Sequence, residues 1–379
     1  MEKTVKDVVK ESFWIMPATP NFIDNGIPYI TSKNIKMGKL DFSKVQYISQ
    51  NDYDEISKNR PIIVNDLLIS MIGTLGNVAI VKECDIPFYG QNMFLLRLNP
   101  DIVDLRYFYN YFNSDTINSY LQSKKNKSTQ GYLKANHIDD LRIPIVSLEE
   151  QKRIADELDK ITDLINKRKE QLSKMDELVK ARFVELFGDP KYNKNNLVKI
   201  GEIGALTSGG TPSRAKPEYF EGDIRWYSAG ELNSLYLPDS VEHISETALQ
   251  QSSAKLFNKG TLMIGMYDTA AFKMGILTED SSSNQACANL NPKQGYNIVW
   301  LYYLFDIMKP IFLQERRGVR QKNLSLSKIK EFEVPFAPFE LQNQFATFVE
   351  QTDKSKLEVQ KSLEKLELLK KALMQKYFG

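Results

Sequence analysis

The residues best suited to chemistry in this sequence are two clusters of lysine and arginine among amide and hydroxyl side chains. No acidic residue occurs from Thr116 to Ile138 or from Arg316 to Lys330, and the clusters recur 191 residues apart, so that Lys125 corresponds to Arg316. Clustered cations neutralise DNA phosphates, and amides and hydroxyls bond base edges or sugar-phosphate groups. A solvated basic loop is the alternative, but the recurrence favours DNA contact. The cluster residues expected to bind DNA are Lys124, Lys125, Lys127, Thr129, Gln130, Lys134, Arg316, Arg317, Arg320, Gln321 and Lys322.

Weaker candidates for DNA contact lie in turns outside the clusters. Glycine-rich turns bring backbone amides close to a phosphate, although tight turns also arise for purely structural reasons. A glutamine amide bonds adenine through both of its polar atoms, although glutamines also end strands as satisfied polar groups. These additional candidates are Gly73, Thr74, Asn77, Gln91, Ser208, Gly209, Gly210, Thr211, Arg214 and Gln285.

Patterns typical of catalysis or metal binding are weak. The two histidines, His137 and His243, occupy non-equivalent places in the repeat and lie in no metal-ligand spacing. The two cysteines, Cys84 and Cys287, form no Cys-x-x-Cys pair, which argues against a structural zinc site and suits a reducing cytoplasm. Neither a Gly-x-x-x-x-Gly-Lys phosphate loop nor the Asn/Asp-Pro-Pro-aromatic segment of amino-methyltransferases occurs. We therefore predict no catalytic residue and no metal site in this chain.

The elements that position these residues are organised around a long polar helix expected over residues 147–188. Its apolar residues recur in steps of three, four and seven, which is a heptad seam. Ser147 is the expected cap, and Glu150 would complete a capping box. A second such helix follows 191 residues later and ends with the same Phe-Gly pair, so we expect the two helices to bury their stripes against each other. The expected interface residues are Ile154, Leu158, Ile161, Ile165, Leu172, Met175 and Val179 in the first helix, and Phe345, Val349, Val359, Leu363, Leu366 and Leu373 in the second. The expected seam also includes Leu186, Thr352 and Leu369.

The globular stretches that precede the two helices also repeat each other. Thr19-Pro20 corresponds to Thr211-Pro212, and the aromatic helix expected at 105–121 returns at 299–313. The expected fold class is α+β, with two similar domains, each a curved and mostly antiparallel sheet with helices beside it. Two long helices paired as an antiparallel coiled coil separate the domains and complete a pseudo-twofold repeat. The expected boundaries are 1–146 and 189–337 for the domains and 147–188 and 338–379 for the helices. No further segment is expected before the first domain.

The bulk composition is that of an ordinary globular protein. The chain has 379 residues, a hydrophobic content of 42% and a charged content of 26%, which allows two or three domains with sizeable cores. The net charge is only +2, so any binding to DNA must come from local patches. No apolar run approaches the length of a membrane span, and the N-terminus lacks a signal-peptide core. We therefore expect a cytoplasmic protein without membrane contact.

This arrangement resembles the specificity subunit of type I restriction-modification systems over the whole chain. The resemblance rests on PIVSLEEQKRIADEL at the start of the first helix, ELFGDP at its end, the Thr-Pro and Ile-Gly-Thr-like segments of each globular unit, and the order of the repeats. It implies two target recognition domains, each reading one half of a bipartite site in double-stranded DNA, with the helix pair as a ruler between the halves. Pro17-Ala18 stand where the second unit has Gly209-Gly210, so a glycine-mediated contact is not implied in the first unit.

The resemblance also implies that this bacterial or archaeal chain has no catalytic activity and no cofactor of its own. Two methyltransferase subunits would dock on the helix pair and use S-adenosylmethionine to methylate adenine. In the full complex, two restriction subunits would use ATP and magnesium. Two alternatives remain at the level of sequence: an autonomous DNA-modifying or DNA-cleaving enzyme with an unrecognised active site, and an interaction scaffold whose domains bind protein.

Overall fold

The computed structural model describes residues 1–36, 38–73, 75–124, 132–316 and 323–379. The chain divides into two compact units. Unit 1 comprises Met1–Lys169 and Lys361–Gly379, and unit 2 comprises Glu170–Gln360. Each unit therefore contains one globular stretch and a part of each long helix. Several predicted DNA-binding residues lie outside the described residues, namely Thr74, Lys125, Lys127, Thr129, Gln130, Arg317, Arg320, Gln321 and Lys322.

Unit 1 is built on two sheets of four strands. Its strands are β1 (Glu2–Thr4), β2 (Val9–Ile15), β3 (Phe22–Ile23), β4 (Ile27–Thr31), β5 (Ile35–Lys36), β6 (Lys39–Leu40), β7 (Gln46–Ile48), β8 (Leu67–Ser70), β9 (Val78–Ile80), β10 (Tyr89–Gln91), β11 (Met93–Leu98) and β12 (Arg142–Pro144). The first sheet is antiparallel, with strand order β2-β11-β8-β9. The second has the order β10-β4-β7-β3, and β10 runs parallel to β4. Two short pairs, β1-β12 and β5-β6, stand outside these sheets.

The first sheet of unit 1 is covered on both faces. Successive side chains of a strand point to opposite faces, so one strand supplies two cores. Leu67 and Ile69 of β8 join a cluster that also holds the aromatic helix, whereas Leu68 joins a cluster with the second sheet. All four residues of β8 are buried as a result. This explains why the strand reads as a continuous apolar run rather than an alternating one.

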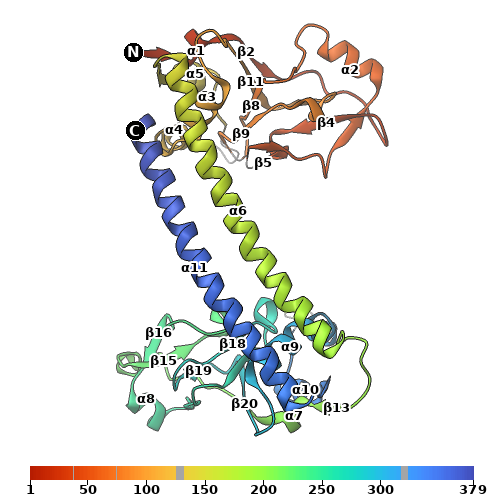
Figure 1. Ribbon diagram of the computed structural model, residues 1–379, viewed down its shortest axis with the longest axis vertical. Helices are drawn as coiled ribbons and strands as arrows, with labels where there is room; N and C mark the ends of the chain where they lie inside the picture. The colour runs from red at the N-terminus through yellow and green to blue at the C-terminus, as the bar shows by residue number, and fades with distance from the viewer. Residues whose placement is uncertain (37, 74, 125–131, 317–322) are drawn as a thin grey trace. The chain divides into compact units, whose positions relative to one another are not determined.

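Unit 2 repeats this topology in its two main sheets, except that, in the described part of the chain, its mixed sheet has three strands and no counterpart of β3. Its strands are β13 (Leu197–Lys199), β14 (Gly204–Ser208), β15 (Ile224–Tyr227), β16 (Glu242–Ile244), β17 (Leu262–Gly265), β18 (Met274–Ile276), β19 (Ser282–Ser283), β20 (Cys287–Pro292) and β21 (Glu333–Pro335). The antiparallel sheet has the order β14-β20-β17-β18, and the mixed sheet has the order β16-β15-β19 with β19 parallel to β15. The predicted α+β class with two similar domains is confirmed (Figure 1).

The aromatic helix predicted at residues 105–121 is in fact two helices, so that prediction was wrong. Ser114 interrupts it, because its hydroxyl accepts the N–H of Ile117 and caps a new helix. The equivalent helix of unit 2 is continuous despite Pro310. The shorter helices are α1 (Val5–Val8), α2 (Gln50–Ser57), α3 (Leu105–Phe112), α4 (Asp115–Ser123), α5 (Asn136–Asp139), α7 (Ile200–Ile203), α8 (Glu246–Gln251), α9 (Ile298–Phe312) and α10 (Leu326–Glu331).

Two long helices, α6 (Leu148–Phe187) and α11 (Phe339–Phe378), run antiparallel within each unit (Figure 1). In unit 1, the Tyr377 hydroxyl donates to Glu157 at 2.8 Å, and Lys169 pairs with Glu367 at 2.8 Å. A later residue of α6 therefore meets an earlier residue of α11. The same holds in unit 2, where Lys356 pairs with Asp176 and the ring of Phe183 lies 5.2 Å from that of Phe345. As predicted, the Ser147 hydroxyl accepts the N–H of Glu150 at 3.2 Å and caps α6.

The heptad seam is buried along most of its length. The fully buried seam residues are Ile154, Leu158, Ile161, Ile165, Val179, Phe345, Val349, Val359 and Leu363, whereas Leu172, Met175, Leu366 and Leu373 are half-buried. One predicted seam residue was wrong, because the side chain of Leu369 is 48% exposed. Its neighbour Lys370, which corresponds to Val179, is half-buried in its place, and burial lowers the pKa of its ammonium group. A prediction that accepts only apolar residues at seam positions chooses Leu369 and therefore misses Lys370.

Candidate nucleic-acid interface

The strand ends of the antiparallel sheet in unit 1 form a row of hydrogen-bonded chain segments. The N–H of Asn92 donates to the carbonyl of Ile15 at 2.9 Å, and the N–H of Met71 donates to the carbonyl of Asn92 at 3.4 Å. The N–H of Leu133 then donates to the carbonyl of Met71 at 3.0 Å. Four segments distant in sequence thus meet at one edge of the sheet. We call this arrangement the strand-end row.

Unit 2 has a corresponding strand-end row, in which the last two of the three hydrogen bonds recur. The N–H of Met266 donates to the carbonyl of Ala286 at 2.9 Å, and the N–H of Leu324 donates to the carbonyl of Met266 at 2.8 Å. Ser208, the last residue of β14, pairs with Ala288 of β20 and brings the Thr-Pro segment to the same edge. Most predicted DNA-binding residues of unit 2 outside the basic cluster therefore lie on or beside this row, namely Ser208, Gly209, Gly210, Thr211 and Gln285. The exception is Arg214.

The basic clusters enter the row at its end. In unit 1 the described part of the cluster begins with Lys124, which is the C-cap residue of α4. Its ammonium group lies 5.1 Å from the ring centre of Tyr120. It returns at Tyr132, which forms a β-bridge with Ile72, and the exposed Lys134 follows. In unit 2 the cluster begins at Arg316, whose guanidinium donates to the carbonyl of Leu313 at 3.0 Å.

A turn with left-handed backbone follows the central strand of each row. Gly73 has φ +84°, and its equivalent Asp268 has φ +48°. The backbone N–H of Asp268 donates to the side chain of Asn323 at 3.0 Å, which ties the turn to the end of the basic cluster. At Gly73, a Cβ atom would meet no other atom within 4 Å. A larger side chain would therefore fit at this position, but the left-handed backbone conformation favours glycine.

Two predicted residues of unit 2 meet in the structure although they are 74 residues apart. The hydroxyl of Thr211 donates to Oε1 of Gln285, which holds an exposed glutamine amide at the edge of the row. Beside them the ammonium of Lys255 donates to the carbonyl of Ser208 at 3.1 Å. In unit 1, the hydroxyl of Tyr29 donates to Oε1 of Gln91 at 3.5 Å. In both units, therefore, a glutamine beside the row bonds a hydroxyl group through its amide oxygen.

The predicted contact between phosphate and the amides of Gly209 and Gly210 is corrected by the structure. Both glycines are buried, and their N–H groups donate to the carbonyls of Cys287 and Ser283. A Cβ atom on Gly210 would lie 1.9 Å from the carbonyl oxygen of Ser253. Close chain packing, and not anion binding, is therefore the reason for these glycines.

Two further candidates already have partners inside the protein. The guanidinium of Arg214 forms two hydrogen bonds with the carboxylate of Glu242 and lies 4.1 Å from the ring centre of Phe220. The side-chain amide of Asn77 donates to the carbonyl of Ile35 at 3.2 Å, and its backbone N–H donates to Ser70. These contacts hold both side chains in place.

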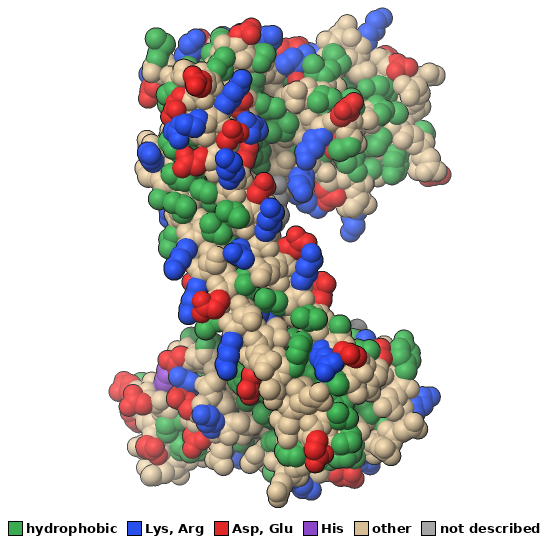
Figure 2. Space-filling model, in the orientation of Figure 1, with side chains coloured by type: hydrophobic (Ala, Val, Ile, Leu, Met, Phe, Trp, Pro, Cys, Tyr) green, Lys and Arg blue, Asp and Glu red, His purple; other side chains and the backbone are tan. Residues whose placement is uncertain are grey.

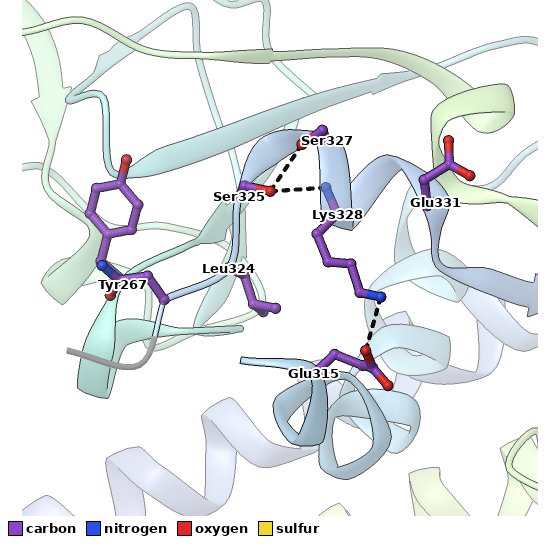
Figure 3. Close-up of a pocket in the computed structure, with 8 residues that line it drawn as sticks. Tyr267, Glu315, Leu324, Ser325, Ser327, Lys328 and Glu331 are labelled. Carbon is purple, nitrogen blue, oxygen red and sulfur yellow. Dashed lines mark hydrogen bonds and ion pairs between the residues drawn. The ribbon is translucent and has the colours of Figure 1, made fainter. Parts of the chain in front are cut away.

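A hollow of about 540 Å³ adjoins the row in unit 2. Figure 3 shows Lys328 reaching across it to Glu315, with a separation of 2.9 Å between ammonium and carboxylate. The hydroxyl of Ser325 accepts the N–H of Lys328 and lies 3.0 Å from the hydroxyl of Ser327 (Figure 3). Some of the polar groups that line the hollow therefore bond one another, and Tyr267 and Leu324 complete its wall.

Cations missed by the sequence prediction lie near both rows. In unit 1 the hydroxyl of Ser32 donates to the carbonyl of Ile72, which brings the exposed Lys33 beside the Gly73 turn. In unit 2 the missed cation is Lys255. Neither lysine belongs to a run of basic residues, so charge clustering in the sequence gives no signal for them. Only the hydrogen bonds between distant segments identify them.

The electrostatics of the described surface are local. Basic and acidic side chains are interspersed over the face that Figure 2 shows. Burial, with Lys124 and Lys134 nearby, lowers the pKa of His137 and so favours its neutral imidazole. Within the described ranges, no three His, Cys, Asp or Glu residues are grouped to hold a metal ion. No described helix has both the length and the hydropathy needed to cross a membrane.

Two internally repeated units of mixed sheet and helix, each including parts of both long helices, define the structural class of this chain. A model of the family described as type I restriction modification DNA specificity domain matches residues 1–174 and 192–368. The chain belongs to this family. DNA sequence recognition as part of a type I restriction-modification system is therefore the function of its class.

Curated relatives and solved structures agree with this family. The chain is 31% identical over 160 residues to the MjaIX specificity subunit of a type I restriction enzyme from Methanocaldococcus jannaschii, a match that covers 41% of this chain and 37% of that relative. It is 24% identical over 396 residues to the putative MjaX specificity subunit of the same organism, with 98% and 91% covered. Its fold is similar to the crystal structure of the type I S subunit from M. genitalium, with a TM-score of 0.59, 16% identity, and 100% and 96% of the chains covered. A chain from a structure described as showing assembly and conformational transition of the type I R-M system gives a TM-score of 0.62 at 16% identity, with 100% and 97% covered.

Proposed function

We propose that this chain is the non-catalytic recognition subunit of its restriction-modification complex and that each unit reads one half of a bipartite DNA site. The observation that carries the proposal is the strand-end row, in which the bonds of Met71 and Leu133 in unit 1 match those of Met266 and Leu324 in unit 2. A basic cluster adjoins one end of each row, and a glutamine whose Oε1 accepts a hydrogen bond from a hydroxyl group lies beside the row. Different side chains on the same frame support two different half-sites.

Within each row, cations and amides have separate roles in this proposal. Lys124, Lys134 and Arg316, together with the other residues of the two basic clusters, neutralise phosphates and position the domain. Gln91 and Gln285 reach base edges in the major groove, where a glutamine amide matches adenine. Thr211 acts through Gln285, because its hydroxyl fixes the orientation of the amide.

The paired helices set the distance between the two half-sites in this proposal. A helix rises about 1.5 Å per residue, so one added turn lengthens it by about 5.4 Å. That change exceeds the rise of one base pair, which is about 3.4 Å. Inserting one turn at matching places in α6 and α11 is therefore expected to lengthen the gap of the recognised site by one or two base pairs.

Catalysis belongs to partner subunits in this proposal. Two methyltransferase subunits dock on the chain and use S-adenosylmethionine, and their reaction requires adenine to leave the base stack. Two restriction subunits that use ATP and magnesium complete the complex where they are present. The chain itself supplies the position on DNA, and its place of action is the cytoplasm.

Binding to DNA by the purified chain with its methyltransferase partner tests the proposal. Affinity is expected to fall steeply as salt rises, and methyl transfer is expected only when both components are present. Affinity that is insensitive to salt would favour a protein-binding scaffold instead. Methylation or cleavage by the purified chain alone would favour an autonomous enzyme.

A further inference from the structure

Asn92 joins the two sheets of unit 1 at the strand-end row. It lies between β10, which ends at Gln91, and β11, which begins at Met93. The chain therefore passes from the second sheet to the antiparallel sheet through this one residue, and its backbone there is left-handed, with φ +64°. The sharp change of direction explains this conformation, which asparagine adopts more readily than most residues other than glycine.

Both backbone polar groups of Asn92 bond the protein. Its N–H donates to the carbonyl of Ile15 at 2.9 Å, and its carbonyl accepts the N–H of Met71 at 3.4 Å. The side chain is half-buried, and no hydrogen bond joins its amide to another residue in the part of the chain that the structure describes. The backbone is therefore fixed by the row, and the side-chain amide is left to bond a ligand.

Other asparagines of unit 1 bond the protein through their side chains. The amide of Asn34 donates to two backbone carbonyls, at 2.8 and 3.2 Å. The amide of Asn77 donates to the carbonyl of Ile35 at 3.2 Å. Asn92 differs from both, because the turn explains its left-handed backbone but gives its amide no partner. The presence of an amide at this position therefore calls for another reason.

The corresponding link of unit 2 is longer and places an alanine in the row. Three residues, 284–286, join β19 to β20. The carbonyl of Ala286 accepts the N–H of Met266, so Ala286 holds the place of Asn92 in the row. Among the described residues with a left-handed backbone, Asn92 is included and Ala286 is not. The hydrogen bonds of the row therefore require neither an asparagine nor a left-handed residue at this place.

We propose that Asn92 is a specificity-determining residue whose side-chain amide reads one adenine in the half-site of unit 1. An asparagine amide matches adenine in the major groove, because its oxygen accepts a bond from the N6 amino group and its nitrogen donates to N7. The preceding residue, Gln91, carries a second amide. Consecutive Cα atoms are about 3.8 Å apart and consecutive base pairs about 3.4 Å, so the two amides suit adjacent base pairs.

The inference rests on the proposed function and deepens it, because it names a base contact that the two units do not share. In unit 2 the methyl group of Ala286 takes the place of the amide. A methyl group cannot hydrogen-bond adenine, but it suits contact with the methyl group of thymine. Unit 1 therefore favours adenine at a base pair where unit 2 does not, and equivalent places in the two rows read different bases.

Binding of the chain with its methyltransferase partner to short duplexes tests the proposal. The duplexes carry the methylated motif, with each of the four bases in turn at every position of both half-sites. Asn92→Gly keeps the left-handed turn and removes the amide. It is expected to reduce discrimination in favour of adenine at one position by roughly 5- to 150-fold and to leave the other half-site unchanged. The loss should come from weaker binding to the adenine duplex alone.

A second variant keeps the shape of the side chain and changes its hydrogen bonding. Asn92→Asp replaces the donor of the amide by an acceptor, and a carboxylate accepts a bond from the N4 amino group of cytosine. This variant is expected to favour cytosine over adenine at the position that Asn92→Gly relaxes. Continued preference for adenine in Asn92→Asp would contradict a direct contact between the amide and the base.

Asn65→Gly is the matched control. Asn65 is also left-handed, with φ +73°, but it precedes β8 (Leu67–Ser70), whereas the row follows the other end of that strand. This variant is expected to bind every duplex as wild type does, and unchanged thermal melting establishes that each variant folds. Unchanged discrimination by Asn92→Gly, an equal loss in the control, or weaker binding to every sequence would overturn the inference and leave the proposed function intact. A wild-type complex that distinguishes no duplex would overturn both.

Discussion

Gln151 and Gln342 make the same set of hydrogen bonds in the two units. Oε1 of Gln151 accepts the backbone N–H of Asp104 at 2.9 Å, and Oε1 of Gln342 accepts that of Asn297 at 2.8 Å. Asp104 and Asn297 are the N-cap residues of α3 and α9. Each glutamine also donates to two backbone carbonyls, namely those of Ile102 and Val146 in unit 1, and of Gly295 and Ala337 in unit 2. The glutamine pair thus joins the start of each long helix to its globular stretch.

Replacing either glutamine is expected to destabilise its own unit. Gln151→Ala or Gln342→Ala leaves three backbone groups without their partner, and each glutamine is fully buried. The expected loss is about 2–3 kcal/mol in the free energy of unfolding, measured by chemical denaturation. The exposed Gln344→Ala is the control and is expected to change stability by less than about 0.5 kcal/mol. Equal stability of all three variants would mean that these bonds contribute nothing.

Lys370 is expected to destabilise the packing of α11 against α6, because it occupies a half-buried seam position. It replaces an apolar seam residue, and burial disfavours its charged form, so its pKa lies below the ordinary 10.5. Lys370→Leu is therefore expected to raise the free energy of unfolding by about 1 kcal/mol at pH 7, a figure kept small by solvent screening.

The pH dependence of this effect has a definite sign. As pH rises toward 10.5, the folded state releases the lysine proton before the unfolded state does, so the unfolded chain holds more protons and stability rises. The difference between wild type and Lys370→Leu is therefore expected to shrink as pH rises through the folded pKa toward 10.5. A difference that is constant over this range would contradict the account of the buried charge.

The basic cluster of unit 2 is expected to bind phosphate without reading sequence. Arg316, Arg317 and Arg320, all changed to alanine, should weaken DNA binding for every sequence. They should also lower the slope of log affinity against log salt by roughly 0.9 for each phosphate that is no longer neutralised. Binding measured by fluorescence anisotropy at several salt concentrations gives both quantities. Unchanged affinity and slope would remove this cluster from the DNA surface.

Gln285 is expected to read one base of one half-site. Gln285→Ala should relax discrimination at that position by about 1–3 kcal/mol and leave the other half-site unchanged. Thr211→Val, which keeps the shape and removes the hydroxyl, should relax the same position to a smaller extent. Gln91→Ala is the matched change in unit 1 and should affect the other half-site. Methylated-motif sequencing of strains that carry each variant checks these results; a motif unchanged by Gln285→Ala would exclude this role.

The sequence predicts the long helices well because core packing is periodic. Heptad spacing and a capping serine suffice to find α6, whose observed limits, Leu148–Phe187, lie within one residue of the expected ones. The same periodic rule fails at Leu369, because it cannot recognise a lysine at a seam position. It also misses the break at Ser114, where a single cap begins a new helix.

The strand-end row is much harder to predict from sequence. It joins segments such as Met71, Asn92 and Leu133 by backbone hydrogen bonds, which do not depend on side-chain type. For the same reason, the sequence does not reveal that the N–H groups of Gly209 and Gly210 donate to carbonyls within the protein. Their glycine-rich sequence is also typical of an anion-binding turn. The basic clusters can be predicted because several cations lie close together in the sequence. Lys255 lies beside the row of unit 2 but belongs to no such cluster, so the sequence does not predict it.

Sequencing of native genomic DNA for methylated adenine, with and without this gene, tests the central claim most directly. The account predicts that deletion removes one bipartite methylated motif and that expression of the intact gene from a plasmid restores it. The methyltransferase subunit must be present in both strains, as checked by mass spectrometry. Persistence of every methylated motif after deletion would contradict the claim that this chain selects the DNA target.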